Sequence, residues 1–163
     1  MIKVKLSNWK SDHQMDEAYK ALRTNIQFCG ADKKVIAFTS CTPNEGKSSV
    51  TFNLAASLAE SGKSVLLIDA DLRKSVDQEV MGLAHYLSKQ AKLSDVICAT
   101  TLPKFHIIFS GIVPPNPAEL LGNRLFKDMI RVVRDVYDYV IVDTPPLGLI
   151  IDSAIIADSC DGS

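Results

Sequence analysis

The feature that most constrains this chain is the loop at residues 39–49, which reads TSCTPNEGKSS and lies between two apolar runs. The run at 35–38 predicts a short buried strand, and the run at 50–59 predicts a helix. A strand, a tight loop ending in GKS and a helix together form a phosphate-binding loop, because backbone N–H groups point into the loop and the helix start adds partial positive charge. The sequence therefore predicts a nucleotide site.

One position of this loop departs from the general pattern, since Cys41 stands where a glycine is expected, five residues before Gly46. Asn44 tolerates a left-handed backbone better than other non-glycine residues, so the loop can still close. Lys47 is expected to reach the β- and γ-phosphates, and the Ser48 hydroxyl is expected to bind Mg²⁺. The alternative is a GKS turn that binds nothing; the flanking strand and helix favour the phosphate loop.

The composition indicates one globular domain over residues 1–163, with an extended polar arm at 1–14, because 47% of the residues are hydrophobic. The net charge of −1 provides no overall attraction to nucleic acid or to anionic lipid. Four scattered cysteines lack metal-ligand spacing and indicate a reducing, cytoplasmic compartment. No apolar run reaches the roughly eighteen residues that a membrane span needs, so direct membrane insertion is not expected.

Further apolar runs predict the remaining elements. Strands are expected at 64–71, 105–110 and 138–144, and helices at 15–29, 83–87, 93–97, 117–136 with a break near Gly122, and 152–158. Continuous apolarity, as opposed to alternation, is typical of strands covered on both faces in a parallel sheet. We therefore expect an α/β fold of the P-loop NTPase type, with a mostly parallel central sheet between two layers of helices.

Carboxylates follow two of these expected strands: Asp69 and Asp71 end the run at 64–71, and Asp143 ends the run at 138–144. Ligands of open α/β sheets bind outside the carboxyl edge. A single strand-end aspartate is often a cap or turn residue, but three such residues downstream of a phosphate loop favour a functional site. Carboxylates beside a lysine and a phosphate site are suited to hold Mg²⁺.

Four segments, at 43–48, 69–74, 114–121 and 137–146, together resemble the bacterial tyrosine kinases of capsular and exopolysaccharide assembly. The resemblance covers nearly the whole chain from about residue 15. It implies ATP or ADP and Mg²⁺ as cofactors. The activity that it implies is an ATP-dependent protein-tyrosine kinase that autophosphorylates between subunits and regulates polysaccharide synthesis and export.

The resemblance also assigns roles to residues. It implies that Lys47, Asp69 and Asp71 are catalytic, and that Ser48, Asp71 and Asp143 bind the metal. Asp69 would activate the tyrosine hydroxyl; because an ordinary Asp has a pKa near 4 and a tyrosine near 10, we expect it to orient the hydroxyl and to accept the proton late. The nucleotide-binding set implied by the resemblance is Thr42, Pro43, Asn44, Glu45, Gly46, Lys47, Ser48, Ser49 and Arg73.

A charged helix face near the N-terminus has two interpretations. Glu17, Lys20 and Arg23 can simply be a solvated face, on which a helix pair contributes a few tenths of a kcal/mol. They also match the ExxRxxR pattern with which relatives contact neighbouring subunits in a ring, except that lysine replaces the middle arginine and lacks its bidentate fork. The resemblance thus implies a homo-oligomer.

The same resemblance implies partners and location. Without a membrane segment of its own, the chain resembles the stand-alone form, which a membrane adaptor of the polysaccharide co-polymerase type activates through its cytoplasmic tail at the inner face of the membrane. A cognate tyrosine phosphatase is a further implied partner. A nucleic acid partner is not expected. Relatives continue beyond the position of Ser163 through another strand into a tyrosine-rich tail, which this sequence does not contain. The lone His85 and the tyrosines at 19, 86, 137 and 139 are interpreted as structural.

Two other classes of protein remain as alternatives. A ParA- or MinD-like switch ATPase usually has a second lysine early in the loop, where this chain has Cys41 or Thr42. Such proteins also need a basic surface or a membrane-binding tail, which the neutral composition does not support. The second alternative is a regulatory nucleotide-binding subunit without transfer activity.

Overall fold

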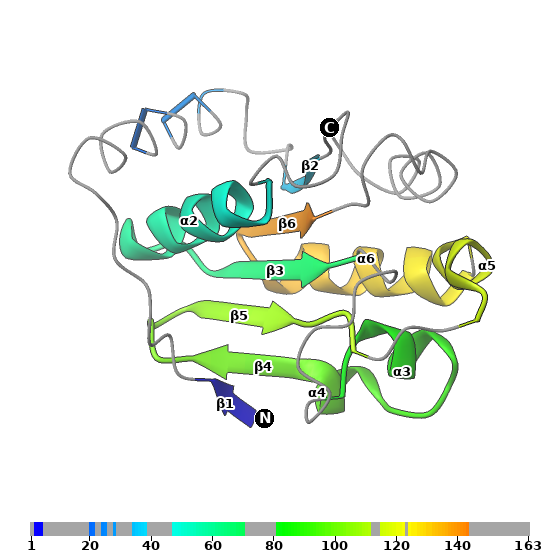
Figure 1. Ribbon diagram of the computed structural model, residues 1–163. Helices are drawn as coiled ribbons and strands as arrows, with labels where there is room; N and C mark the ends of the chain where they lie inside the picture. The colour runs from blue at the N-terminus through cyan, green and yellow to red at the C-terminus, as the bar shows by residue number, and fades with distance from the viewer. Residues whose placement is uncertain are drawn as a thin grey trace.

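The structure is a computed structural model that describes residues 2–4, 20, 21, 24, 25, 28, 34–38, 47–70, 81–111, 115–122 and 124–143. Within these ranges six strands form one sheet in the order β1-β4-β5-β3-β6-β2 (Figure 1). The strands are β1 Ile2–Val4, β2 Val35–Phe38, β3 Val65–Asp69, β4 Ile97–Thr100, β5 Phe105–Ile108 and β6 Tyr139–Asp143. The helices are α2 Lys47–Glu60, α3 Leu83–Leu87, α4 Leu93–Val96, α5 Pro117–Leu121 and α6 Arg124–Val136.

The sheet is mostly parallel, as expected. Strands β5, β3, β6 and β2 all run the same way, and only the β4–β5 pair is antiparallel among the pairs formed by the described residues. All four predicted strands are present. The sequence did not predict β1, which lies in the expected extended arm and pairs in parallel with β4, nor β4 itself. The helix predicted at 93–97 ends at Val96, and β4 begins at the next residue.

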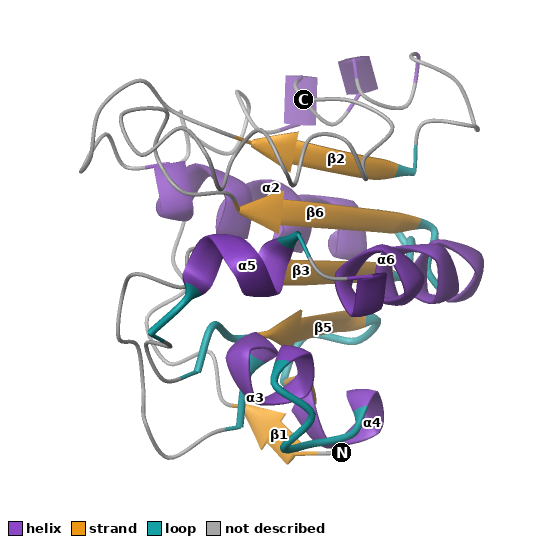
Figure 2. Ribbon diagram, turned by 90° about the vertical axis from the view of Figure 1, so that its right-hand side faces the viewer, coloured by secondary structure: helices purple, strands orange, loops and turns teal. Residues whose placement is uncertain are grey.

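Helices cover both faces of the sheet, which confirms the three-layer α/β/α architecture. Figure 2 shows α5 and α6 in front of the sheet and α2 behind it. Side-chain alternation along β3 divides the core accordingly: Leu66 and Ile68 pack with the α6 side, and Val65 and Leu67 pack with α2. Because both sets are buried, β3 reads as a continuous apolar run in the sequence.

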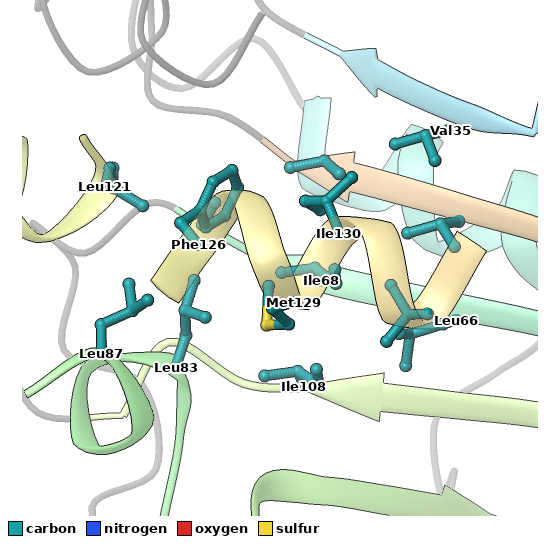
Figure 3. Close-up of a cluster of buried hydrophobic side chains, with 14 of the residues drawn as sticks. Val35, Leu66, Ile68, Leu83, Leu87, Ile108, Leu121, Phe126, Met129 and Ile130 are labelled. Carbon is teal, nitrogen blue, oxygen red and sulfur yellow. The ribbon is translucent and has the colours of Figure 1, made fainter. Parts of the chain in front are cut away.

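The cluster on the α6 side explains why the run at 124–136 is a helix. Phe126, Met129, Ile130 and Val133 follow the i, i+3, i+4, i+7 spacing of one helical face, and all four are buried. In Figure 3 this face of α6 points at the sheet, toward residues such as Ile68. Fully burying a side chain of this size contributes about 1.5–3 kcal/mol, so the cluster holds α6 on the sheet.

The register between β3 and β6 is fixed at the amino ends of the strands. Ser64 and Asp138 bind reciprocally: the Ser64 N–H donates to Asp138 Oδ2 at 2.9 Å, and the Asp138 N–H donates to Ser64 Oγ at 2.9 Å. The hydrogen bond from the Ser64 backbone lowers the pKa of the Asp138 carboxyl. This pair aligns the two strands before their buried cores begin.

Other expectations near α5 and α6 agree with the structure. Pro117 is the first residue of α5, the Leu120 N–H donates to the Asn116 carbonyl at 3.1 Å, and the helical region breaks between Leu121 and Arg124. The tyrosines at 86, 137 and 139 are buried or partly buried, as predicted. In the predicted helix at 15–29 the described residues are helical, whereas Tyr19 and the helix predicted at 152–158 lie outside the described residues.

One polar contact links the end of α6 to the sheet. His106 Nδ1 on β5 lies 2.7 Å from the Tyr137 hydroxyl, and the two rings meet edge to face. Burial lowers the pKa of His106 and raises that of Tyr137, so the pair is held in its neutral form.

This contact predicts a pH dependence. Because the folded state depresses the pKa of His106, its contribution is complete above the unfolded pKa of about 6.5 and is lost as the pH falls through the lower folded pKa. Urea unfolding between about pH 7.5 and about pH 5.5 should show a larger fall in the free energy of unfolding for the wild type than for His106→Gln, which keeps a polar partner for Tyr137 but does not titrate there. Identical pH profiles for the two proteins would contradict this prediction.

Candidate functional site

Three parallel strands end together at the carboxyl edge of the sheet. Strand β6 lies between β2 and β3, and Asp143 at its end is in register with Phe38 at the end of β2 and with Asp69 at the end of β3. The Ala70 N–H then donates to the Asp143 carbonyl oxygen at 2.9 Å, which extends the β3–β6 pairing one step past the strand. The predicted phosphate loop therefore leaves β2 beside the two strand-end carboxylates.

The two carboxylates lie on the same face of the sheet. Along β3, Val65 and Leu67 pack with α2, and along β6, Tyr139 and Ile141 do the same. Because side chains alternate along a strand, Asp69 and Asp143 belong to this α2 face too. Asp143 is only 4% exposed, and Asp69 is partly exposed.

Helix α2 begins at the same edge. Lys47 is its first residue, followed by the helical Ser48 and Ser49, and only eight residues separate it from the end of β2. The positive end of the helix dipole and the first N–H groups of α2 are therefore on the side of the sheet to which Asp69 and Asp143 belong. A helix start of this kind is suited to bind a phosphate group through its free N–H groups and its dipole.

Several predicted site residues lie outside the described residues. These are Glu17, Arg23, the loop at 42–46, Asp71 and Arg73. Lys20, from the expected subunit contact, is an exposed helical residue. The described part of the site thus consists of the start of α2 with Asp69 and Asp143.

The strand-end carboxylate of Asp143 is a ligand of the kind that Mg²⁺ takes. In the described part of the chain, no group of three or more His, Cys, Asp or Glu side chains is arranged to hold a metal ion. Mg²⁺ usually keeps several waters and binds one or two carboxylates together with substrate phosphates. Asp143, at the edge where α2 begins, supplies an oxygen donor of this kind.

One feature of this edge was missed by sequence reasoning. The start of α3 is bound to the end of β5, because the Leu83 N–H donates to the Phe109 carbonyl at 2.7 Å and the Ala84 N–H donates to the Ser110 carbonyl at 3.1 Å. The signal in the sequence is weak, namely a glycine at 82 and another at 111. His85, interpreted as structural, belongs to this junction: its Nδ1 accepts a hydrogen bond from the Gly82 N–H at 2.9 Å.

A mostly parallel sheet that brings a helix start and two strand-end carboxylates to one edge is typical of α/β nucleotide-binding domains, the P-loop class among them. A family model described as an AAA domain matches residues 33–160. The tyrosine-protein kinase CpsD of Streptococcus agalactiae is 46% identical over 163 residues, which cover 96% of this chain and 70% of that protein. The chain belongs to the family of bacterial tyrosine kinases of capsule and exopolysaccharide synthesis.

Solved structures agree with this assignment. The BceF tyrosine kinase domain matches with a TM-score of 0.83 and 39% identity, over 90% of this chain and 62% of that chain. The septum site-determining protein MinD of Pyrococcus horikoshii, solved with Mg-ADP, matches with a TM-score of 0.66 and 28% identity, over 78% of this chain and 55% of that one. MinD-like ATPases are therefore the more distant likeness. Every helix in the described ranges is too short or too polar to cross a membrane.

The position of Asp143 predicts a specific defect. In Asp143→Asn, nucleotide binding without Mg²⁺ should persist, but the gain in ADP affinity on adding Mg²⁺ should fall by about tenfold or more, because one anionic oxygen donor is lost. Titration with a fluorescent ADP analogue, with Mg²⁺ or with EDTA, measures both affinities. Asp135→Asn, at an exposed position on α6, is the matched control. If Asp143→Asn showed the same gain in ADP affinity on adding Mg²⁺ as the wild type, Asp143 would not be a ligand of the metal.

Proposed function

We propose that this chain transfers the γ-phosphoryl group of ATP to protein tyrosine, on neighbouring copies of itself and on other proteins. The observation that supports this most directly is the register of Asp69 with Asp143 at the edge where α2 begins. Membership of the tyrosine kinase family supports the choice of a tyrosine as the acceptor. A nucleotide-binding edge alone would be compatible with many reactions.

In this proposal the phosphate-binding residues are those of the loop at 42–49 together with Arg73. Lys47 neutralises charge on the β- and γ-phosphates, and the helix start adds donors for the same oxygens. Ser48, Asp71 and Asp143 hold Mg²⁺, which supplies neutralisation of phosphate charge when bound. A loose phosphoryl-transfer transition state needs little beyond positioning and such neutralisation.

Asp69 orients the acceptor. The tyrosine oxygen forms the new P–O bond while the bond between the γ-phosphorus and the bridging oxygen of ADP breaks, and ADP leaves with that oxygen. Because the hydroxyl is a weak acid in the ground state, its proton moves late to the Asp69 carboxylate and from there to solvent. The place of Asp69 at the end of β3, partly exposed, is suited to a residue that must meet a protein substrate.

The proposed partners follow from the family. Glu17, Lys20 and Arg23 would contact a neighbouring subunit in a ring, and exposure of Lys20 supports such a surface. A membrane adaptor would recruit and activate the chain through the adaptor's own cytoplasmic tail. The chain would then lie in the cytoplasm, at the inner face of the membrane. A cognate phosphatase would reverse the modification.

A MinD-like switch ATPase is the second candidate, because the MinD structure, a more distant match to this fold, was solved with Mg-ADP. A regulatory subunit that binds nucleotide without transferring phosphate is a third outcome. The three differ in the fate of the phosphate: tyrosine, water, or neither.

Incubation of the full-length protein with ATP and Mg²⁺, with and without the adaptor tail, should yield phosphotyrosine. Lys47→Met and Asp69→Ala should each lower the rate by about 100-fold or more, because single groups that neutralise charge or orient reactants in a transition state have effects of this size. Lys63→Met, at an exposed position beyond the other end of α2, and Asp135→Ala are the controls. Phosphate release without labelled tyrosine would favour the switch ATPase, and bound nucleotide with neither product would favour the regulatory subunit.

A further inference from the structure

Most of the large apolar side chains that the described residues expose lie on two helical segments. The exposed set is Phe28 at 84%, Val136 at 67%, Val132 at 52% and Met81 at 45%. Phe28 is helical and lies near the N-terminus, and the two valines lie one turn apart on α6. Single exposed apolar residues are common on protein surfaces, so exposure alone does not define a binding surface. What distinguishes these two segments is the pattern around the apolar residues.

The first pattern is a ridge made of Lys20, Thr24 and Phe28, which we call the N-terminal ridge. All three residues are helical and exposed, and they follow the i, i+4, i+8 spacing of one helical row. The Thr24 hydroxyl donates to the Lys20 carbonyl at 2.9 Å, across one turn. At 1.5 Å per residue, this ridge places a positive charge about 12 Å from an exposed aromatic ring.

The second pattern is a ridge made of Asp128, Val132 and Val136, which we call the α6 ridge. It has the same i, i+4, i+8 spacing, with a negative charge at one end and an exposed apolar side chain at the other. The Asp128 side chain is 45% exposed, and its ion pair with Arg124 is 3.9 Å long. An exposed pair of this length contributes little, so the Asp128 carboxylate can take another partner.

The two ridges are complementary in register. If Phe28 packs on Val136, the equal spacing brings Lys20 to Asp128 and the Thr24 methyl group to Val132. Rows of i±4 residues on two helices lie side by side when the helices cross at about −50°, which is the commonest class of helix packing. Residues of both ridges are therefore spaced to meet in an ordinary helix–helix contact.

The ridges lie in different parts of one molecule. In Figures 1 and 2 the described helical residues between 20 and 28 lie beyond the β2 edge of the sheet, whereas α6 lies at the level of β6 and β3. Neither Phe28 nor the two exposed valines belong to the hydrophobic clusters of the core. A contact between the two ridges is therefore one that two copies of the chain can make.

We propose that the N-terminal ridge of one copy docks on the α6 ridge of the next copy. The inference deepens the proposed subunit contact at Lys20, on which it rests, by naming the surface that receives it; it does not depend on phosphoryl transfer. Because each copy uses two different ridges, the contact is head-to-tail, and such contacts close into a ring where the rotation allows.

The apolar end of the contact is tested by sedimentation velocity of the full-length protein at a series of concentrations, without nucleotide. The wild type should associate as the concentration rises. Phe28→Asp and Val136→Asp should each abolish association, because each places a charge where the partner is apolar. Both positions are exposed, so the melting temperatures should remain within a few degrees of the wild type, which shows that the variants are folded.

Mixing the two variants tests the head-to-tail geometry. Phe28→Asp keeps an intact α6 ridge, and Val136→Asp keeps an intact N-terminal ridge. An equimolar mixture should therefore form a dimer that grows no further, since only one competent pair of ridges is present. A mixture that stays monomeric would overturn the proposal, as would self-association of Val136→Asp alone, which a contact between two Phe28 side chains would permit.

The charged end is tested by exchange of the two charges. Lys20→Asp and Asp128→Lys should each raise the dissociation constant by about fivefold, and the variant that carries both should return to within about twofold of the wild type. Lys127→Asp is the matched control, because it reverses an exposed charge about 140° around α6 from Val132 and should change the dissociation constant by less than about twofold.

Two further results would contradict the proposal: a wild type that stays monomeric at every concentration, or association that neither Phe28→Asp nor Val136→Asp weakens. Failure of the kinase function is a separate result. Phosphotyrosine formation is measured in its own assay, and a chain that associates through these ridges but labels no tyrosine would refute the kinase while supporting this contact.

Discussion

The alignment of β3 with β6 is the constraint on which the site depends. At the amino ends of these strands Ser64 and Asp138 exchange two hydrogen bonds, and at the carboxyl ends Asp69 stands opposite Asp143. A slip of one residue would move every side chain of β3 to the other face, so that Leu66 and Ile68 would leave the α6 cluster. The same slip would take Asp69 away from the α2 face. Core burial and the geometry of the carboxylates are therefore held by one register.

The two faces of the sheet have different tasks in this arrangement. The α6 face carries a cluster that includes Phe126 and Met129, and its chemistry is apolar packing. The α2 face is also apolar along most of its length, but at the carboxyl edge the pattern of side chains gives way to acidic residues beside a helix start. A site at that position can be polar because the strands end there and the core no longer needs to be filled.

Much of this could be predicted from the sequence, and the exceptions have physical reasons. The strands β2, β3 and β6 are built on continuous apolar runs, and β5 is interrupted only by His106, which is a local signal. Strand β4 follows α4 without an intervening turn, and a four-residue run does not distinguish helix from strand. Strand β1 has mixed polarity and becomes a strand through pairing with β4, a contact that no local pattern encodes. For the site, strand-end aspartates predicted that Asp69 and Asp143 meet at one edge. The backbone bonds between α3 and β5 could not be predicted, because they depend on where the chain returns to the sheet.

The sheet order also has a consequence for folding of the protein during its synthesis on the ribosome. The first two strands in the chain have partners that come much later: Ile2 pairs with Cys98, and Val35 pairs with Val140. Synthesis proceeds at about 5–20 residues per second, so β2, from which the phosphate loop leaves, waits several seconds for the neighbour that orders it. During this interval the nascent chain exposes apolar strands that lack their hydrogen-bonded partner strands. Such a state is prone to association with other chains. Among the described strands, β6 is synthesised last, and it is also the strand that brings Asp143 to the site.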